Sequence, residues 1–118
     1  MTKKRPSADQ FAFTFDAPRP ATLPAALAGM DARIARTVSE ILKHEDRDRI
    51  VIAAEMSVLL AEEVSKAMLD AYASPARDGH NISFARMLAL IAVTNRFDLL
   101  DRELRAIGAA VLVGDEIY

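Results

Sequence analysis

The sequence predicts an all-α protein, a compact bundle of about five helices with a corner like a helix-turn-helix. Composition is the first reason, because the 118 residues are 52% hydrophobic and 27% charged, with four glycines and no tryptophan. The second reason is that apolar residues recur at helical spacing in successive stretches between residues 24 and 108. The third is that residues typical of helix caps precede several of these stretches.

The chain divides into an N-terminal arm over residues 1–22 and a single helical domain over residues 23–118. The arm contains three prolines and no helical period. Its apolar residues alternate and would share one side of an extended segment, namely Phe11, Phe13 and Phe15. We expect this side to lie against protein, because an uncovered apolar strand aggregates in water. The sequence leaves open whether the arm docks on its own domain or on another subunit.

The first helix is expected to begin near Pro24, which suits a first helical turn. Its apolar stripe comprises Leu27, Met30, Ile34, Val38, Ile41 and Leu42. A charged run from His44 to Arg49 then breaks the stripe, and Asp46 or Asp48 can cap the helix that follows. This second helix is expected over Ile50–Leu60, with Ile52, Met56 and either Leu59 or Leu60 facing the core.

The third helix is expected over Val64–Ala73, with Val64, Met68, Ala71 and Tyr72 facing inward. After a loop, Ser83 can cap a fourth helix with an inward face of Phe84, Met87, Leu88 and Ile91. Asn95 with Asp98 resembles a capping pair that opens a fifth helix, which Gly108 ends. Its expected inward face comprises Phe97, Leu100, Leu104 and Ile107. A short C-terminal strand is expected at Val111–Val113 and could pair with Phe11–Phe15.

Little in the chain suggests catalysis. With no cysteine, thiolate chemistry and the usual zinc sites are excluded. Asp78 and His80 alone make a weak metal site, and a triad of Ser65, Asp70 and His80 has no strained elbow or oxyanion loop beside it. An enzyme is therefore not expected, and neither is a cofactor, a metal or a small-molecule substrate. Without a signal peptide or an apolar run of ~20 residues, a cytoplasmic protein away from membranes is expected.

The stretch from Ala53 to Ser74 is the best candidate for a functional element. In a helix-turn-helix, the first helix braces the second, which enters the major groove of DNA. The bracing positions are filled here by Ile52, Ala53, Met56 and Val58. On the second helix, the residues expected to point outward are Ser65, Lys66, Leu69, Asp70 and Ala73. The turn departs from the common pattern, because Ser57 and Val58 stand where glycine is usual, and Lys66 is the only cation on the outward face.

Two runs carry a resemblance to a known group of proteins: VSKAMLDAYASPARDGHNISFARMLALIAVT and FDLLDRELRAIGAAVLVG. They resemble small regulatory proteins of Mu-like and other temperate phages and prophages and, more distantly, CII-like phage regulators. The resemblance covers residues 31–113, and its most specific parts are Val64–Lys66, Met68–Ser74 and His80–Ser83. It implies a phage-type helix-turn-helix transcriptional regulator with Val64–Ser74 as the recognition helix.

Double-stranded DNA is therefore the expected partner. The candidate contact residues are Ser65, Lys66, Leu69, Ala73, Arg77, His80, Asn81 and Arg86. The net charge of −2 offers few cations per chain, so binding is expected to need a homo-oligomer. The alternative is a protein-interaction component of phage replication or transposition machinery that does not touch DNA. A shared basic patch would favour the regulator, whereas an exposed apolar groove with scattered charges would favour the alternative.

Overall fold

The computed structural model describes residues 18–76 and 79–114 and shows an all-helical protein. Within these residues, five α-helices and one 3₁₀-helix follow one another: α2 Met30–Lys43, α3 Arg49–Leu60, α4 Lys66–Tyr72, α5 Phe84–Thr94, α6 Phe97–Leu104 and η1 Arg105–Ile107. No strand occurs in these two ranges. The prediction of an all-α fold with about five helices is therefore confirmed.

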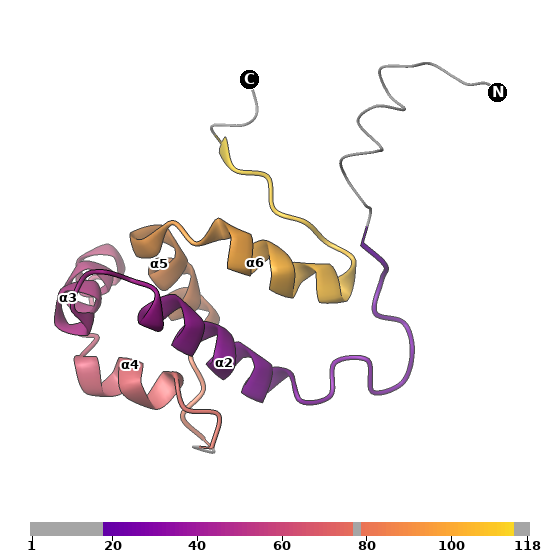
Figure 1. Ribbon diagram of the computed structural model, residues 1–118, viewed down its shortest axis with the longest axis horizontal. Coiled ribbons are helices and arrows are strands. Elements are labelled where there is room, and N and C mark those ends of the chain that lie inside the picture. The colour runs from indigo at the N-terminus through magenta and orange to yellow at the C-terminus, as the bar shows by residue number, and fades with distance from the viewer. Residues whose placement is uncertain (1–17, 77–78, 115–118) are drawn as a thin grey trace.

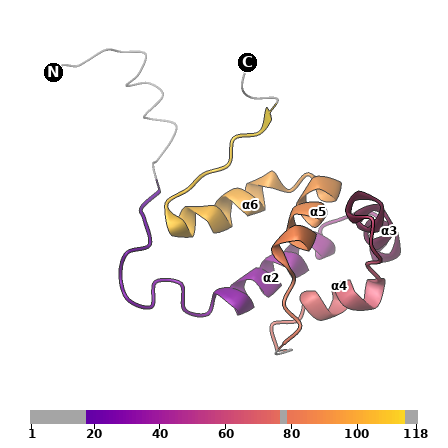
Figure 2. The same cartoon turned by 180° about the vertical axis from the view of Figure 1, so that it is seen from behind.

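The α-helices of the described residues pack into one bundle. α3 lies at one end and α6 toward the other, with α2 between them and α4 below α2 (Figure 1). Seen from behind, α5 passes in front of α2, and its upper end lies beside α3 and the start of α6 (Figure 2). α3 packs most extensively against α5 and next against α4, and α4 also contacts α2, so both α5 and α2 hold the α3–α4 pair to the rest of the bundle.

The first helix starts later than expected, at Met30 instead of near Pro24. Ala25 and Gly29 have φ angles of 61° and 77°, and these left-handed conformations interrupt a right-handed helix. Residues 23–29 form successive turns instead, with Ala26 N–H bonded to Leu23 O and Ala28 N–H bonded to Ala25 O. Pro24 therefore does not begin the first helix, although proline suits a first helical turn.

The α3–α4 corner, where a helix-turn-helix was predicted, turns at Ala61–Ser65. Asp48 caps α3 by accepting a hydrogen bond from Ile50 N–H at 3.0 Å, as predicted. The helix continues through Ser57 and ends at Ala61, whose φ of 54° is left-handed. Ser57 and Val58 therefore lie within α3, which ends at Leu60 as predicted, and not at the turn position where glycine is usual. α4 is shorter than the predicted Val64–Ala73 because Ser65 is its N-cap, accepting a hydrogen bond from Met68 N–H at 3.2 Å.

Two further predictions concern the C-terminal half. Ser83 caps α5 as expected, with Arg86 N–H donating to its hydroxyl at 3.2 Å. Asn95, however, closes α5 in a left-handed conformation, and Arg96 stands at the N-cap of α6. The capping role assigned to Asn95 was therefore placed on the wrong helix.

The expected strand at Val111–Val113 does not form: this segment belongs to no helix or strand. Val111 N–H instead donates to Asp101 Oδ1 at 2.8 Å, which ties the segment to α6. The strand's suggested partner, Phe11–Phe15, lies outside the described residues.

The core gathers side chains from all five α-helices. Its fully buried large members are Val38, Ile41, Ile52, Met56, Leu69, Leu90 and Ile91. Three side chains predicted to face inward from α3 and α5 are instead exposed, namely Val58, Phe84 and Leu88, and of the alternatives Leu59 and Leu60 it is Leu60 that packs against the core. α3 and α5 are apolar on several sides, so spacing alone could not select the buried face. Leu27 and Ile107, also predicted to face inward, are exposed as well.

Candidate nucleic-acid interface

Ser57 of α3 connects the turn between α3 and α4 to α3 through hydrogen bonds. Ser57 Oγ donates to the carbonyl oxygen of Ala53 at 2.8 Å and accepts from Val64 N–H, also at 2.8 Å. The first bond is made within α3, and the second holds the end of the turn against that helix. Val64 is then buried, which fixes where α4 begins relative to α3.

The inward face of α4 differs by one residue from the expected one. Leu69, which was predicted to point outward to DNA, is completely buried, so this prediction is wrong. Tyr72, three residues later on the same face, is buried as predicted, while Met68 is only partly buried. Because α4 starts at Lys66 and not at Val64, and packs on both α3 and α2, the Leu69–Tyr72 pair faces the core.

The outward face of α4 is small and mixed in charge. Lys66 and Ala67 are exposed, whereas Ser65, Asp70 and Ala73 are partly buried. The sequence interpretation missed Ala67, although its three-residue spacing from Asp70 could have placed it beside that residue on one helical face. The Ser65 hydroxyl is already engaged as the cap of α4.

The cations next to α4 are paired with a carboxylate. Lys66 Nζ lies 2.8 Å from Asp70 Oδ2, and Arg49 Nη1 of α3 lies 2.7 Å from Asp70 Oδ1. The hydrogen bond from Lys66, followed by that from Arg49, lowers the pKa of Asp70 below its ordinary value. Asp70 is therefore ionised at neutral pH, and the three side chains together carry one net positive charge. Sequence reasoning also missed Arg49, which belongs to the helix before the turn.

Arg86 joins three elements around the corner. Its Nη1 donates to the Tyr72 hydroxyl at 2.9 Å, and its Nη2 lies 3.0 Å from Glu62 Oε1 in the turn. The hydrogen bond to Tyr72, together with the charges around it, raises the pKa of Arg86. This partly buried guanidinium ties α5 to α4 and to the turn, so its role in the structure is to hold the corner in place.

The loop residues lie less close to the predicted interface. His80 and Asn81 are both exposed, and Asn81 Nδ2 makes a long hydrogen bond of 3.4 Å to Asp31 Oδ2 at the start of α2. Arg77 and Asp78 lie outside the described residues. The structure thus brings Arg49, Lys66 and Asp70 together, with Arg86 held nearby by Glu62. It does not gather Lys66, His80 and Arg86 into one uncompensated basic patch.

Comparisons with known proteins do not add to this picture. No family model, curated protein or solved structure matches the chain. Within residues 18–76 and 79–114, no group of three or more His, Asp or Glu side chains is arranged to hold a metal ion. Over the same residues, no helix is both long enough and apolar enough to cross a membrane. A function is therefore inferred from the α3–α4 corner and from the charged side chains around it.

Proposed function

We propose that the chain is a DNA-binding regulator of the helix-turn-helix type, with α4 as the helix that enters the major groove. The α3–α4 corner carries this proposal. A left-handed residue, Ala61, ends the first helix at the position where such turns often have glycine, and a capped second helix follows. Lys66 and Ala67 are exposed near the start of that helix, the part that contacts bases in this motif.

A second support is the resemblance of residues 31–113 to phage regulators. In that resemblance, Val64–Ser74 corresponds to the recognition helix, and the structure has α4 over most of this segment. A role in phage or prophage transcription is part of the same proposal.

The pairing of the cations limits how one chain could bind DNA. Phosphate neutralisation supplies most non-specific affinity, and Asp70 already compensates part of the charge of Lys66 and Arg49. We therefore propose that binding requires a homodimer or larger assembly, in which two corners contribute their cations to one DNA duplex. Such binding should weaken steeply as the salt concentration rises.

The decisive measurement is fluorescence anisotropy with labelled duplex DNA from the region upstream of the gene, at low and moderate salt. Replacing Asp70 by Asn frees Lys66 and Arg49, so it should tighten binding and steepen the dependence of affinity on salt by about one unit per freed cation. Lys66→Ala should weaken binding, by ~1–3 kcal/mol if Lys66 contacts a base.

Asp98→Asn is the matched control. Asp98 on α6 pairs with Arg96 at 3.0 Å, so the substitution makes the same change in net charge and frees an arginine away from the α3–α4 corner. It should change affinity much less than Asp70→Asn. Equal effects of the two variants, or no binding by the wild-type chain at micromolar concentration, would reject the proposal.

One observation favours a second candidate, a protein-interaction component of phage machinery that does not bind DNA. An apolar groove of about 300 Å³ opens between α2, α5 and α6, away from the candidate DNA surface. Under this alternative, the groove would be the functional site and the ion pairs of α4 would only stabilise the fold. If neither the wild type nor Asp70→Asn changes the anisotropy of the labelled DNA, this alternative is favoured.

A further inference from the structure

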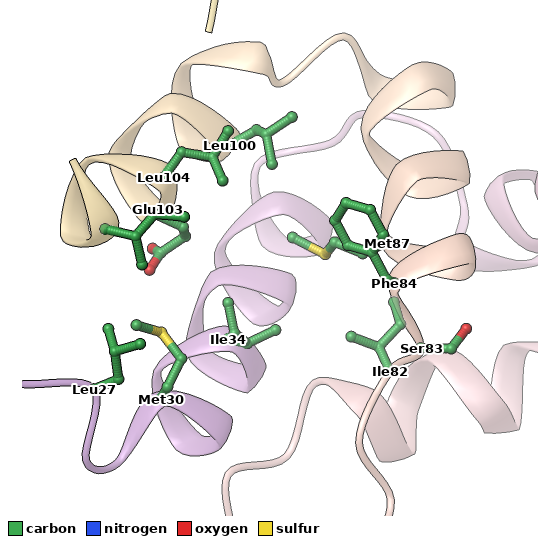
Figure 3. A pocket seen from close by; sticks show the side chains of 11 residues that line it. Leu27, Met30, Ile34, Ile82, Ser83, Phe84, Met87, Leu100, Glu103 and Leu104 are labelled. Carbon is green, nitrogen blue, oxygen red and sulfur yellow. The ribbon is translucent and has the colours of Figure 1, made fainter. Parts of the chain in front are cut away.

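The groove between α2, α5 and α6 is lined almost entirely by apolar side chains. Side chains from all three helices point toward a common space (Figure 3). From α2 and the turn before it come Leu27, Met30 and Ile34; from α5 and its start Ile82, Phe84 and Met87; from α6 and η1 Leu100, Leu104 and Ile107. Phe84 is 70% exposed and Ile107 49% exposed, so both leave large apolar area open to water.

The one charged side chain in the groove lining is Glu103, and its charge is already balanced. Arg33 Nε lies 2.6 Å from its Oε1, and the Thr37 hydroxyl donates to its Oε2 at 2.7 Å. Its carboxylate is directed toward α2, and the surrounding walls are formed by aliphatic and aromatic groups (Figure 3). A complementary occupant is therefore apolar and does not need to bring a charge.

Arg19 and Pro20 lie at one end of this groove. A Cβ atom placed on Gly108 would lie only 2.8 Å from Pro20 Cα, so the backbone of Pro20 rests directly on Gly108. Gly108 is the immediate neighbour of Ile107, which lines the groove. The chain that precedes Pro20 is therefore attached at the end of the groove where Ile107 lies.

We propose that Phe11, Phe13 and Phe15 of the same chain occupy this groove. Phe15 stands five residues before Pro20, and five extended residues span up to ~17 Å, which allows the first ring to reach past Ile107. Alternation places the three rings on one side of an extended segment, with the small side chains of Ala12 and Thr14 on the side that faces water. The arm thus covers the apolar surface of its own domain.

This inference does not depend on DNA binding, because none of the groove residues belongs to α3 or α4. It assigns the arm an intramolecular site in preference to a contact on a second subunit. A protein partner that binds the groove would then have to displace the arm.

The experiment uses the full chain with Phe13→Trp, which introduces the only tryptophan of the sequence. Docking in the groove should shift its emission to shorter wavelength than in urea-unfolded protein, and should reduce acrylamide quenching severalfold. Ile107→Asp and, separately, Phe84→Asp in this background should move the emission toward the solvent-exposed value. Far-ultraviolet circular dichroism verifies that each variant keeps its helix content.

Val58→Asp is the matched control, because Val58 is 80% exposed on α3, a helix that contributes nothing to the groove. Its emission should equal that of the Phe13→Trp parent. Emission typical of exposed tryptophan in the parent, or no response to either groove substitution, would overturn the proposal. So would emission and mass by light scattering that both change with protein concentration, because the ring would then bind a second copy.

Discussion

The hydroxyl of Thr37 on α2 donates a 2.7 Å hydrogen bond to the carboxylate of Glu103 on α6, and both side chains are buried. Arg102 Nη2 also donates to the Thr37 oxygen at 3.0 Å, and Arg33 pairs with the other oxygen of Glu103. The ion pair of Arg102 Nη1 with Glu40 Oε1 at 3.1 Å also joins the two helices. The interactions of this polar cluster form together only in one relative position of α2 and α6.

The first prediction follows from this cluster. Thr37→Val keeps the shape of the side chain but leaves a buried carboxylate with one hydrogen bond fewer, which should lower the free energy of unfolding by about 1–3 kcal/mol. Urea denaturation followed by circular dichroism measures the loss. Thr22→Val, at an exposed position, is the control and should have almost no effect.

The second prediction concerns Gly108. Its φ of 85° suits glycine, and a Cβ atom would also meet the backbone of Pro20 at 2.8 Å. Gly108→Ala should therefore destabilise the protein by more than about 1 kcal/mol, since both the conformation and the space oppose the substitution. Gly114→Ala, where a Cβ atom meets nothing within 4 Å, should be tolerated in the same thermal melt.

A third prediction tests the orientation of α4. Leu69→Ala removes a completely buried side chain and should cost on the order of 2–5 kcal/mol. Met68→Ala should cost less because Met68 is only partly buried, and Lys66→Ala should change stability by no more than about 0.5 kcal/mol. If Met68→Ala proved costlier than Leu69→Ala, the helix would be rotated relative to this structure.

The fourth prediction concerns pH. Ion pairs and hydrogen bonds lower the pKa values of several aspartates, including Asp70, Asp98 and Asp101. A lowered native pKa stabilises the fold at pH values above the unfolded pKa, which is about 3.9 for aspartate. That stability is lost as the pH falls through the native pKa values. The free energy of unfolding should therefore be nearly constant from pH 7 to about 5 and decline below about 4.

Asp101→Asn should make this acid-induced decline shallower. The Arg105 guanidinium at 2.7 Å, followed by the Val111 N–H, causes its pKa shift, and the amide cannot titrate. Glu63→Gln, at an exposed position in the turn, provides the comparison. Equal acid sensitivity of Asp101→Asn and wild type in urea titrations would show that Asp101 does not contribute to the decline.

Sequence patterns predicted the helices well where caps and stripes agreed. Asp48 and Ser83 cap the helices they were expected to cap, and Val38, Ile41, Ile52 and Met56 are buried as their spacing indicated. These signals are local, because a cap and an amphipathic face depend on a few neighbouring residues. Asn95 was ambiguous for the same reason, since asparagine suits both a helix N-cap and a left-handed helix end.

The predictions that were wrong concern side chains whose burial or pairing depends on which helices pack against them. Leu100 packs against the core as predicted, yet together with Leu104 and Ile107 it also lines an open groove, because the described helices do not cover that side of α6 and η1. Periodicity identifies an apolar face but not what lies against it. Likewise, the pairing of Lys66 and Arg49 with Asp70 joins two helices, and an outward cation looks free when each helix is considered separately.

The turn between α3 and α4 also has a mechanical consequence. Ala61 occupies a left-handed conformation that a residue with a Cβ atom adopts in only a narrow range of angles, and Ser57 holds the far end of the turn by Val64 N–H. With both ends of a five-residue connection restricted, α3 and α4 should reorient together as one rigid body. Any adjustment to a binding partner would then have to come from motion of the whole corner relative to α2 and α6, because the angle between its two helices has little freedom to change.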